Sequence, residues 1–410
     1  MVSAVLTIGT ELTRGEIVNT NAAHLAARLT DLGFEVVEIA TVDDDIPRIL
    51  NTLRRLSSSC ALIVCTGGLG PTTDDLTAEA AAAALGVPLR RNEDAMLQVR
   101  QRFQQLGRPM SPSNEKQAFL PEGAEILPNA HGSAPGFALH FGESVAFFLP
   151  GVPAEMLPMF DTQVAPRVSG IARNSRVQRR LHTFGLGESL VGERLAGVEE
   201  LFHGVTLGYR VHFPEVEVKV LAVGATPADT RDLCDRATVE VRRRLGPRVY
   251  GEDNDTLGAV LGTLLRAKAS TLAVAESCTG GLVGHLITRQ AGASDYLLLD
   301  AVTYSNASKT TLLGIKEETL GVHGAVSEHV AAAMASGVQR LAGATFGLAV
   351  TGIAGPGGAT ETKPVGTVFL AVATPDRVEV SQRHFGGDRE RVQMLAAYTA
   401  LDLLRKVCCR

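Results

Sequence analysis

Residues 61–77 read ALIVCTGGLGPTTDDLT, and this stretch indicates the fold. An apolar, β-rich run, Ala61–Val64, leads into a glycine loop, and Thr77–Leu85 then has the alanine-rich composition of a helix. A glycine loop between a strand and a helix is typical of open α/β sheets, which bind ligands at the carboxyl ends of their strands.

The segments before this loop show the same alternation. Val5–Ile8 and Val36–Ile39 are predicted strands, and Asn21–Leu32 and Ile46–Leu56 have apolar residues at helical spacing. Strands that alternate with helices predict a parallel sheet covered by helices on both faces. We therefore expect an α/β fold for the first part of the chain.

The pattern changes between Arg176 and Val249, where strands at 205–207 and 216–223 precede a charged helix at 228–245. This arrangement predicts a small α+β module. A polar link, Gly251–Asp255, follows, and Thr256 then caps a helix with a regular apolar stripe.

Strands and helices alternate again from Thr256 to the C-terminus. The predicted strands are 271–275, 301–304, 347–350 and 365–372, and the predicted helices are 281–287, 327–341 and one that Asp388 caps, running to about 404. The fold class is thus α/β, with two α/β domains joined by a small α+β module. We expect domains at 1–172, 173–250 and 251–410, and a fragment that starts near Thr256 should fold alone.

The composition excludes several classes of protein. With 410 residues, 45% of them hydrophobic and 20% charged, the chain is neither disordered nor fibrous. Its 39 basic and 44 acidic residues give a net charge of −5, so it has no overall basic excess for binding nucleic acid. The six cysteines form no CxxC pair, which argues against zinc and for reduced thiols in the cytoplasm. We expect no signal peptide or membrane span.

The glycine loop is the first candidate site. The backbone N–H groups of Gly67, Gly68 and Gly70 can bind phosphate at a helix N-terminus. Thr72 lies in the same loop, and Asp74 and Asp75 could hold a divalent metal ion against the phosphates. The alternative is a simple turn in which the aspartates cap the next helix.

The second candidate site begins at Ser277, in the motif Ala275–Gly281. Its hydroxyl could act as a nucleophile, with the N–H groups of Thr279, Gly280 and Gly281 receiving an oxyanion. Because no histidine is placed as its base, Lys309 in the motif Tyr304–Lys309 is the candidate. The alternative is that Ser277 is a helix cap and Lys309 a surface lysine.

The third candidate segment is the long glycine loop Thr351–Gly358, whose amides could bind a phosphate. The residues singled out in it are Thr351, Gly352, Gly355 and Gly357. Arg389 follows at the start of the last helix, where it could be part of the site or only a solvated charge.

The N-terminal motifs together resemble the competence/damage-inducible CinA family. The matching segments are Gly9–Leu12, Asn19–Asn21, the glycine loop, Asn114–Ala118, Ser133–Phe137 and Leu149–Met156. The resemblance implies a MoaB/MogA-like (molybdopterin-binding-like) domain that acts as a metal-dependent ADP-ribose pyrophosphatase. It places Asp74 and Asp75 near metal and phosphate, with Glu11 and Asp44 as weaker candidates. The implied cofactor is a divalent metal ion of unknown identity, with K+ as an additional candidate.

The C-terminal motifs AESCTGG, TYSNASK, TGIAGPGG and GDR resemble the PncC-type nicotinamide mononucleotide deamidase domain of the same family. That enzyme releases ammonia and nicotinic acid mononucleotide and needs no cofactor. The resemblance implies that Ser277 is the nucleophile, Lys309 its base and Tyr304 a supporting group. It also implies that Arg389 contacts the phosphate or the carboxamide.

Other functions remain open at this point. The N-terminal domain could bind a pterin or nucleotide without catalysis, or the whole chain could be a competence or recombination scaffold. The middle module is KH-like in the family, but Gly185–Ser189 provides no GxxG loop, so a nucleic-acid partner is not expected. The expected partners are the small nucleotides nicotinamide mononucleotide and ADP-ribose, together with a second copy of the chain in a homodimer.

Overall fold

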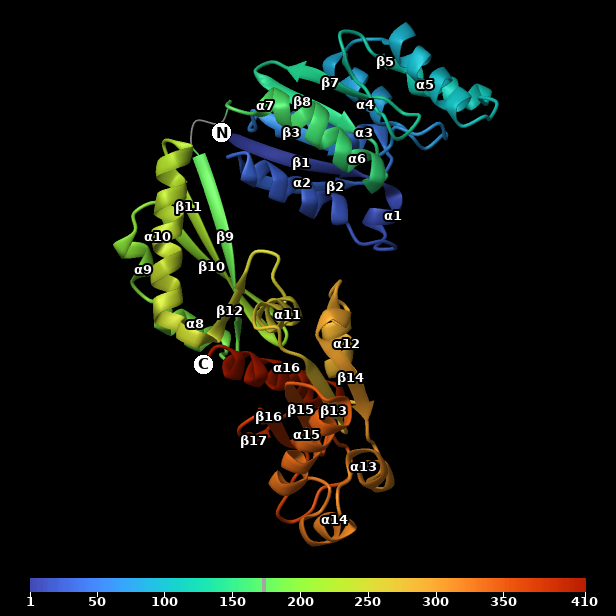
Figure 1. Ribbon diagram of the computed structural model, residues 1–410. Coiled ribbons are helices and arrows are strands. Elements are labelled where there is room, and N and C mark those ends of the chain that lie inside the picture. The colour runs from blue at the N-terminus through green and yellow to red at the C-terminus, as the bar shows by residue number, and fades with distance from the viewer. Residues whose placement is uncertain (172–174) are drawn as a thin grey trace. The chain divides into compact units, whose positions relative to one another are not determined.

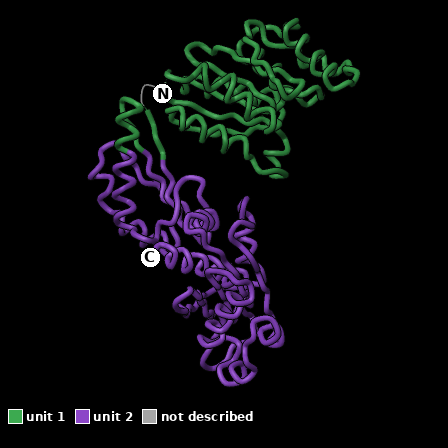
Figure 2. The backbone as a smooth tube through the Cα atoms, in the orientation of Figure 1, with its two compact units in different colours: residues 1–178, 222–233 green, residues 179–221, 234–410 purple. Residues whose placement is uncertain are grey.

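The computed structural model describes residues 1–171 and 175–410, so the predicted boundary at 172/173 lies outside the described residues. The described chain forms two compact units (Figure 2): residues 1–178 with 222–233, and residues 179–221 with 234–410. Among the described residues, every helix is too short or too polar to span a bilayer. All six cysteines are free thiols, of which only Cys409 is exposed.

The N-terminal sheet has the strand order β2-β1-β3-β8-β7-β6. Its strands are β1 (Val2–Ile8), β2 (Glu35–Val42), β3 (Leu62–Thr66), β6 (Glu125–Leu127), β7 (Gly136–Phe141) and β8 (Ser144–Leu149). β2, β1, β3 and β8 run parallel, as expected, whereas β7 and β6 add an antiparallel edge. The sheet is therefore mixed.

Helices cover both faces of this sheet (Figure 1). Leu25 and Leu29 of α2 and Met156 of α6 pack on one face, and Ile49 and Leu53 of α3 pack on the other. The helices are α1 (Thr10–Thr13), α2 (Thr20–Asp31), α3 (Ile46–Ser57), α4 (Thr77–Leu85), α5 (Glu93–Gln105), α6 (Pro153–Met159) and α7 (Ala165–Val168). The short elements are the antiparallel pair of strands β4 (Leu89–Arg91) and β5 (Phe119–Pro121), the 3-10 helix η1 (Pro112–Ala118) and the π-helical turn η2 (Phe160–Val164).

The middle module is an α+β unit, as predicted. Its sheet has the order β10-β11-β9-β12. Its elements are β9 (Ser175–Phe184), α8 (Glu188–Leu195), α9 (Val198–Leu201), β10 (Val205–His212), β11 (Glu215–Gly224), α10 (Pro227–Leu245), η3 (Gly246–Arg248) and β12 (Val249–Glu252).

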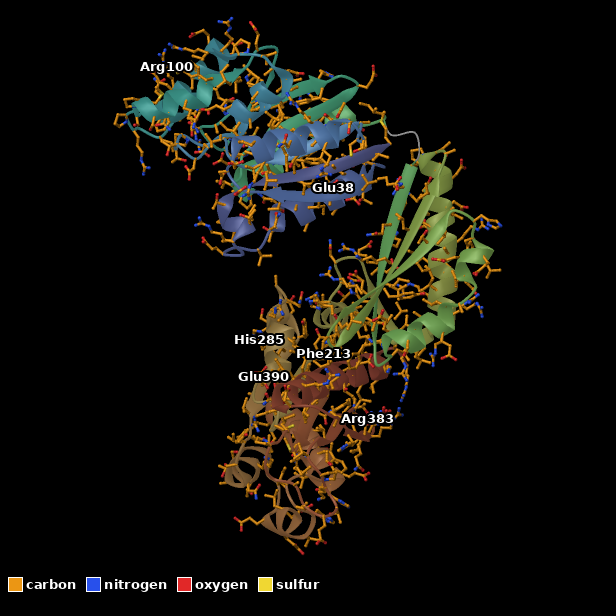
Figure 3. The ribbon with its side chains drawn as sticks, turned by 180° about the vertical axis from the view of Figure 1, so that it is seen from behind. Glu38, Arg100, Phe213, His285, Arg383 and Glu390 are labelled. Carbon is orange, nitrogen blue, oxygen red and sulfur yellow. The ribbon has the colours of Figure 1, made fainter. Side chains whose placement is uncertain are left out.

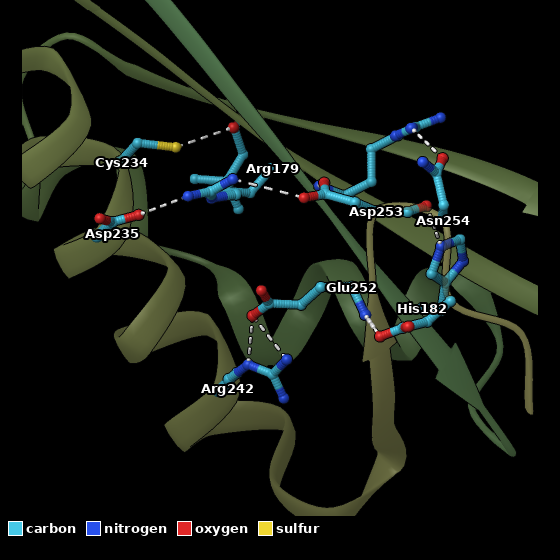
Figure 4. A network of polar contacts seen from close by, with 11 residues as sticks. Arg179, His182, Cys234, Asp235, Arg242, Glu252, Asp253 and Asn254 are labelled. Carbon is cyan, nitrogen blue, oxygen red and sulfur yellow. Dashed lines mark hydrogen bonds and ion pairs between the residues drawn. The ribbon is translucent and has the colours of Figure 1, made fainter. Parts of the chain in front are cut away.

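Three consecutive arginines on α10, residues 242–244, form ion pairs with glutamates. The Arg242 guanidinium donates hydrogen bonds to the Glu252 carboxylate of β12 (Figure 4). Arg243 and Arg244 both form ion pairs with Glu240 on the same helix. These two guanidinium groups lower the pKa of Glu240 to about 2. Ion pairs of this kind leave little unpaired positive charge to attract a nucleic-acid backbone.

The C-terminal sheet has the order β14-β13-β15-β16-β17, with β14, β13 and β15 parallel and the last two strands antiparallel. Leu261, Leu265 and Val392 help to cover one face, and Val330 and Met334 help to cover the other. The elements are α11 (Leu257–Ala267), β13 (Leu272–Glu276), α12 (Leu282–Thr288), η4 (Ala293–Asp295), β14 (Leu297–Val302), α13 (Asn306–Leu313), α14 (Glu317–His323), α15 (Glu328–Ala342), β15 (Phe346–Gly352), β16 (Thr367–Ala373), β17 (Val378–His384) and α16 (Arg389–Cys408).

The polar link before α11 is fixed by hydrogen bonds. Asp253 accepts from the Arg180 amide at 3.0 Å, its own amide donates to the Arg180 carbonyl at 2.8 Å, and His182 contacts its carbonyl (Figure 4). Phe184 and Tyr250 of the middle module are buried in the same core as Leu257. The two modules therefore share apolar contacts, which the sequence did not indicate.

A second contact joins the hairpin between β10 and β11 to α16. The Cζ atom of Arg391 lies 4.3 Å from the centroid of the Phe213 ring. The position of this contact can be found in Figure 3 from the labels of Phe213 and of Glu390, which directly precedes Arg391 in the chain. A cation over an aromatic face is attracted by the ring quadrupole, so this pair adds to the shared core.

The shared core leads to a prediction about fragments. We expect a fragment of residues 256–410 to fold and to keep its activity, but to be about 2–4 kcal/mol less stable than residues 175–410, because core side chains lose their contacts with Phe184 and Tyr250. Denaturant unfolding of both fragments measures the difference. A molten or insoluble short fragment would show that residues 175–255 are required for folding.

Candidate functional site

The C-terminal site lies where three parallel strands end. Ser277 follows β13, Thr303 and Tyr304 follow β14, and the loop 351–358 continues from the end of β15. Because β14, β13 and β15 are neighbours in that order, the three segments meet at one edge of the sheet. The predicted strand 301–304 ends earlier than expected, at Val302.

The Ser277 hydroxyl and the Lys309 amine are in hydrogen-bond contact. Nζ of Lys309 lies 3.1 Å from Oγ of Ser277, although the two residues are 32 positions apart. Lys309 stands on α13, whose first turn is capped by Ser305, and only 1% of the residue is exposed. Lys309 is therefore a buried lysine aimed at a serine, not a surface lysine.

Two backbone carbonyls also hold the amine. Nζ lies 2.6 Å from the Thr303 oxygen and 3.5 Å from the Tyr304 oxygen. These carbonyls are free for Lys309 because β14 stops before them. Burial lowers the pKa of the Lys309 ammonium below its ordinary value. The neutral form of the amine is therefore more favoured in this site than it is in bulk water.

The turn after Ser277 is shaped by Glu276, a residue that sequence reasoning missed. Its two carboxylate oxygens accept from the amides of Gly281 at 2.9 Å and Gly284 at 2.8 Å, and the residue is fully buried. Asp300 lies beside it, and burial, together with the Glu276 charge, raises the pKa of Asp300 to about 7. The signal in the sequence for this role was the glutamate directly before the candidate serine in the motif.

The structure leaves fewer amides free for an oxyanion than the three that the sequence predicted. The Gly280 amide donates to the Ser277 carbonyl, and the Gly281 amide donates to Glu276. Of the three, only the Thr279 amide has no hydrogen-bond partner among the described residues. Gly280 and Gly281, with φ of +64° and +99°, serve instead to turn the chain.

Cys278, the residue after the candidate nucleophile, is a packing residue. Its side chain is buried, and burial raises the pKa of the thiol to about 12. A Cβ atom at Gly352 would lie 2.9 Å from the Thr367 carbonyl oxygen and 3.1 Å from the Cys278 sulfur, and these contacts together explain the glycine at that position. Gln393 of α16 donates to the Cys278 carbonyl at 2.7 Å and holds the turn in place.

Arg389 and Tyr304 are neighbours. The Arg389 guanidinium donates to the Tyr304 hydroxyl at 2.8 Å and to the Gly355 carbonyl at 2.7 Å. Tyr304 is 62% exposed, so its hydroxyl is accessible to a ligand. One arginine thus links the segment after β14 with the loop after β15.

The loop 351–358 provides free amides, as a phosphate site needs. Among the described residues, the amides of Gly355 and Gly357 have no hydrogen-bond partner. Gly352 closes β15 in its pairing with β16. Thr351 is fully buried, lies in β15 opposite Phe369 and donates its hydroxyl to the Ala325 carbonyl at 2.8 Å, so its side chain fixes the start of the loop.

The N-terminal site also lies at the carboxyl ends of parallel strands. A cavity of about 550 Å³ lies there, and its lining includes Glu11, Asp44, Gly67, Gly68, Gly70, Asp74, Asp75 and Glu155. All the predicted residues of this site except Thr72 therefore line one cavity. Thr72 borders the next cavity and donates through its amide, at 2.8 Å, and its hydroxyl to Asp75.

The glycine loop has the geometry of an anion site. Among the described residues, the amides of Gly68 and Gly70 have no hydrogen-bond partner, whereas the Gly67 amide donates to Leu149. Gly67 has a φ of +110°, and a Cβ there would lie 2.0 Å from the Ile8 carbonyl oxygen. Only glycine fits this close approach of β1 and the loop.

Carboxylates surround the free amides. Asp44 accepts from the amide and the hydroxyl of Thr10, at 2.8 and 2.9 Å. Glu155, which sequence reasoning missed, accepts from Asn129 at 2.8 Å and lies against Gly132. No group of three or more histidine, cysteine or acidic residues in the described chain converges on one metal position.

Comparison with known proteins gives matches over the whole length of the chain. Family models match residues 4–170 (probable molybdopterin binding domain), 178–251 (damage-inducible protein CinA KH domain) and 254–408 (CinA C-terminal domain). A CinA-like protein of Geobacter metallireducens is 44% identical over 409 residues, which cover 99% of both chains. A CinA-like protein of Geobacter sulfurreducens is 45% identical over 405 residues, or 98% of both chains.

Solved structures of CinA proteins are also similar to parts of this chain. A CinA protein of Thermoplasma acidophilum is 33% identical, with a TM-score of 0.39, over 41% of this chain and 99% of its own. A competence damage-inducible protein of Klebsiella pneumoniae is 38% identical, with a TM-score of 0.36, over 37% of this chain and 93% of its own. The near-complete coverage of the Geobacter relatives shows that the chain belongs to the CinA family.

Proposed function

We propose that the C-terminal domain is an amidohydrolase that converts nicotinamide mononucleotide to nicotinic acid mononucleotide and ammonia. The observation that carries the proposal is the contact between the buried Lys309 amine and the Ser277 hydroxyl, at 3.1 Å. Membership of the CinA family supports an enzymatic role, and the CinA C-terminal domain model covers this site.

The carbonyls around Lys309 support its role as the base. A neutral amine has two N–H groups and one lone pair. If the N–H groups point to the Thr303 and Tyr304 oxygens, the lone pair faces Ser277. The amine then accepts the hydroxyl proton as the serine oxygen attacks the carboxamide carbon.

The rest of the reaction follows from this proton transfer. The bond from serine oxygen to carbon forms, and the Thr279 amide, which has no hydrogen-bond partner among the described residues, would stabilise the oxyanion. When the carbon–nitrogen bond breaks, the Lys309 ammonium returns its proton to the leaving nitrogen, and ammonia departs. Water, deprotonated by the same amine, then hydrolyses the ester and restores the Ser277 hydroxyl.

The phosphate of the substrate would bind at the glycine loop 351–358. The free amides of Gly355 and Gly357 can donate to its oxygens, and Arg389 adds positive charge close to that loop. The contact of Arg389 with Tyr304 would also orient the tyrosine hydroxyl toward the substrate.

A pH profile tests the role of Lys309. Because burial lowers the pKa of Lys309, the neutral fraction of the amine grows as the pH rises toward that lowered pKa. We expect kcat/KM for deamidation to rise tenfold per pH unit and to level off at a midpoint below the ordinary lysine value of about 10.5. A rate that falls as the pH rises from 6 to 9 would contradict a lysine base.

For the N-terminal domain we propose a metal-dependent pyrophosphatase that cleaves ADP-ribose to AMP and ribose 5-phosphate. The observation that favours it is the cavity that brings Glu11, Asp44, Asp74 and Asp75 next to the free amides of Gly68 and Gly70. The amides would bind the pyrophosphate, and the carboxylates would lie beside it. Release of AMP on incubation with ADP-ribose and Mg²⁺ or Mn²⁺ tests this activity separately from ammonia release.

The donor set of the cavity fits a hard divalent cation. Mg²⁺ is commonly held by one or two carboxylates together with the phosphates of a substrate, so a preformed cage of protein ligands is not required. Asp74 and Asp75 would hold the ion, which would neutralise phosphate charge. Thr72 orients the Asp75 carboxylate for this role. Binding of a pterin or nucleotide without cleavage remains the alternative for this domain.

A further inference from the structure

The turn after Ser277 receives a hydrogen bond from the last helix that the proposed reaction does not use. Nε2 of Gln393 on α16 donates to the Cys278 carbonyl at 2.7 Å, although the two residues are 115 positions apart. Gln393 is half-buried, and Arg389, which contacts Tyr304, lies one helical turn before it. One helix therefore contacts both the turn of the nucleophile and the tyrosine beside it.

Residues 277–280 form a β-turn that the Gly280 amide closes by donating to the Ser277 carbonyl at 3.2 Å. Thr279 does not have a positive φ, as the third residue of a type II turn must, so the turn is of type I. In a type I turn the two central amides, here those of Cys278 and Thr279, point to the same side. Neither of them has a hydrogen-bond partner in the part of the chain that the structure describes. Two adjacent free amides thus directly follow the candidate nucleophile.

The bond from Gln393 determines where the Thr279 amide points. The Cys278 carbonyl and the Thr279 N–H belong to one planar trans peptide unit, so they point in opposite directions. Helix α16 packs on one face of the sheet, and α13, which holds Lys309, packs on the other. The Thr279 amide is therefore directed away from α16, toward the face from which Lys309 approaches.

The same bond also makes the amide a better donor. A hydrogen bond accepted by a carbonyl oxygen polarises the peptide unit, which strengthens the hydrogen bond that its N–H group donates. Donors that stabilise an oxyanion are effective because they are held in place before charge develops. Gln393 supplies both effects from outside the turn, without contacting the Ser277 hydroxyl or the Lys309 amine.

We propose that Gln393 is a positioning residue for the deamidation, because it aims the peptide between Cys278 and Thr279 so that the amides of both residues bind the oxyanion. The oxyanion is the carboxamide oxygen, which takes up an electron pair as the serine oxygen bonds to the carbon. This inference rests on the proposed amidohydrolase, since it assigns a further residue to the same site.

Steady-state deamidation of nicotinamide mononucleotide by the full chain gives the first readout. Gln393→Met keeps the length of the side chain but removes the donor, and it should lower kcat about tenfold while KM stays within about twofold. The midpoint of the pH profile should not move, because Gln393 does not contact Lys309. Gln393→Lys keeps a donor on a flexible stem and should retain kcat within about threefold of the unchanged protein.

Gln339→Met is the matched control. Gln339 of α15 is half-buried too, and its Nε2 donates to the Thr345 carbonyl at 2.9 Å, away from the candidate site. This variant loses the same kind of bond, so its midpoint of thermal unfolding should fall about as far as that of Gln393→Met. Its kcat should be unchanged. An equal loss of kcat in both variants would show that Gln393 acts only through stability and would overturn the inference.

Titration with pyridine-3-boronic acid, followed by boron NMR, gives a readout that does not require turnover. The Ser277 oxygen donates a lone pair to the trigonal boron, its proton passes to Lys309, and the boron becomes tetrahedral and negatively charged, like the oxyanion. Ser277→Ala should abolish the tetrahedral adduct, Gln393→Met should weaken it about tenfold, and Gln339→Met should leave it unchanged.

The outcomes separate the inference from the proposed function. If nicotinamide mononucleotide is deamidated and Gln393→Met leaves kcat and the affinity for the boronic acid unchanged, the role of Gln393 is wrong. If the adduct depends on Ser277 and Gln393 but no ammonia is released from nicotinamide mononucleotide, the positioning role stands and the proposed substrate falls.

Discussion

Ser277→Ala is expected to reduce ammonia release from nicotinamide mononucleotide by about a thousandfold or more, because the covalent step is lost. The serine hydroxyl is the group that the buried Lys309 amine contacts, at 3.1 Å. The neighbouring Cys278 is a poor replacement for it, since burial raises the pKa of the thiol to about 12 and keeps it protonated. Ammonia release and nicotinic acid mononucleotide formation measure the effect.

Cys278→Ala is the matched control for this variant. It changes the next residue along the same turn and removes a buried side chain, so a modest loss of stability is expected. Deamidation should remain within a few fold of the unchanged protein. If Cys278→Ala were inactive and Ser277→Ala active, the nucleophile would be the thiol and the proposed chemistry would be wrong.

Asp75→Ala should abolish AMP release from ADP-ribose, with a loss of at least a hundredfold, while deamidation is unchanged. The carboxylate lines the cavity next to the free loop amides, and it also accepts from the Thr72 amide at 2.8 Å. Its removal therefore takes away a proposed metal ligand and loosens the loop that we propose to bind phosphate.

Asp45→Ala is the control for the loss of a negative charge in this domain. Asp45 caps α3 by accepting from the Arg48 amide at 3.0 Å, and it does not line the cavity. The change should cost about 1 kcal/mol of stability and leave AMP release intact. If Asp75→Ala lowered both activities without unfolding, the two sites would not be independent.

The sequence predicted the helices α4, α11 and α16 well because their composition and capping residues are local signals. The helix Thr77–Leu85 has the expected bounds, and Thr256 and Asp388 cap α11 and α16 as their positions indicated. The strands β9 and β17 were missed because charged and polar residues interrupt their apolar alternation. β17 is an edge strand, and β9 lies between β11 and β12 but still has several charged and polar side chains, so periodicity alone identifies neither strand.

The candidate sites were predicted only in part, for a similar reason. The pairing of Ser277 with Lys309 followed from motifs at the ends of adjacent strands. The Thr303 and Tyr304 carbonyls that hold the amine are backbone groups and have no residue signature. The role of Glu276 depends on which amides its oxygens reach, and the cavities beside the glycine loop depend on how distant segments pack. Neither can be read from spacing along the chain.

Lys309→Arg, assayed for ammonia release from nicotinamide mononucleotide, tests the central claim most directly. A guanidinium keeps the positive charge but cannot accept the serine proton, so turnover should fall nearly as far as in Ser277→Ala. Lys309→Met, which keeps the buried apolar stem, should be equally inactive and should fold, as thermal unfolding can show. Near-normal deamidation by Lys309→Arg would contradict the account and leave Tyr304 or a bound water as the base.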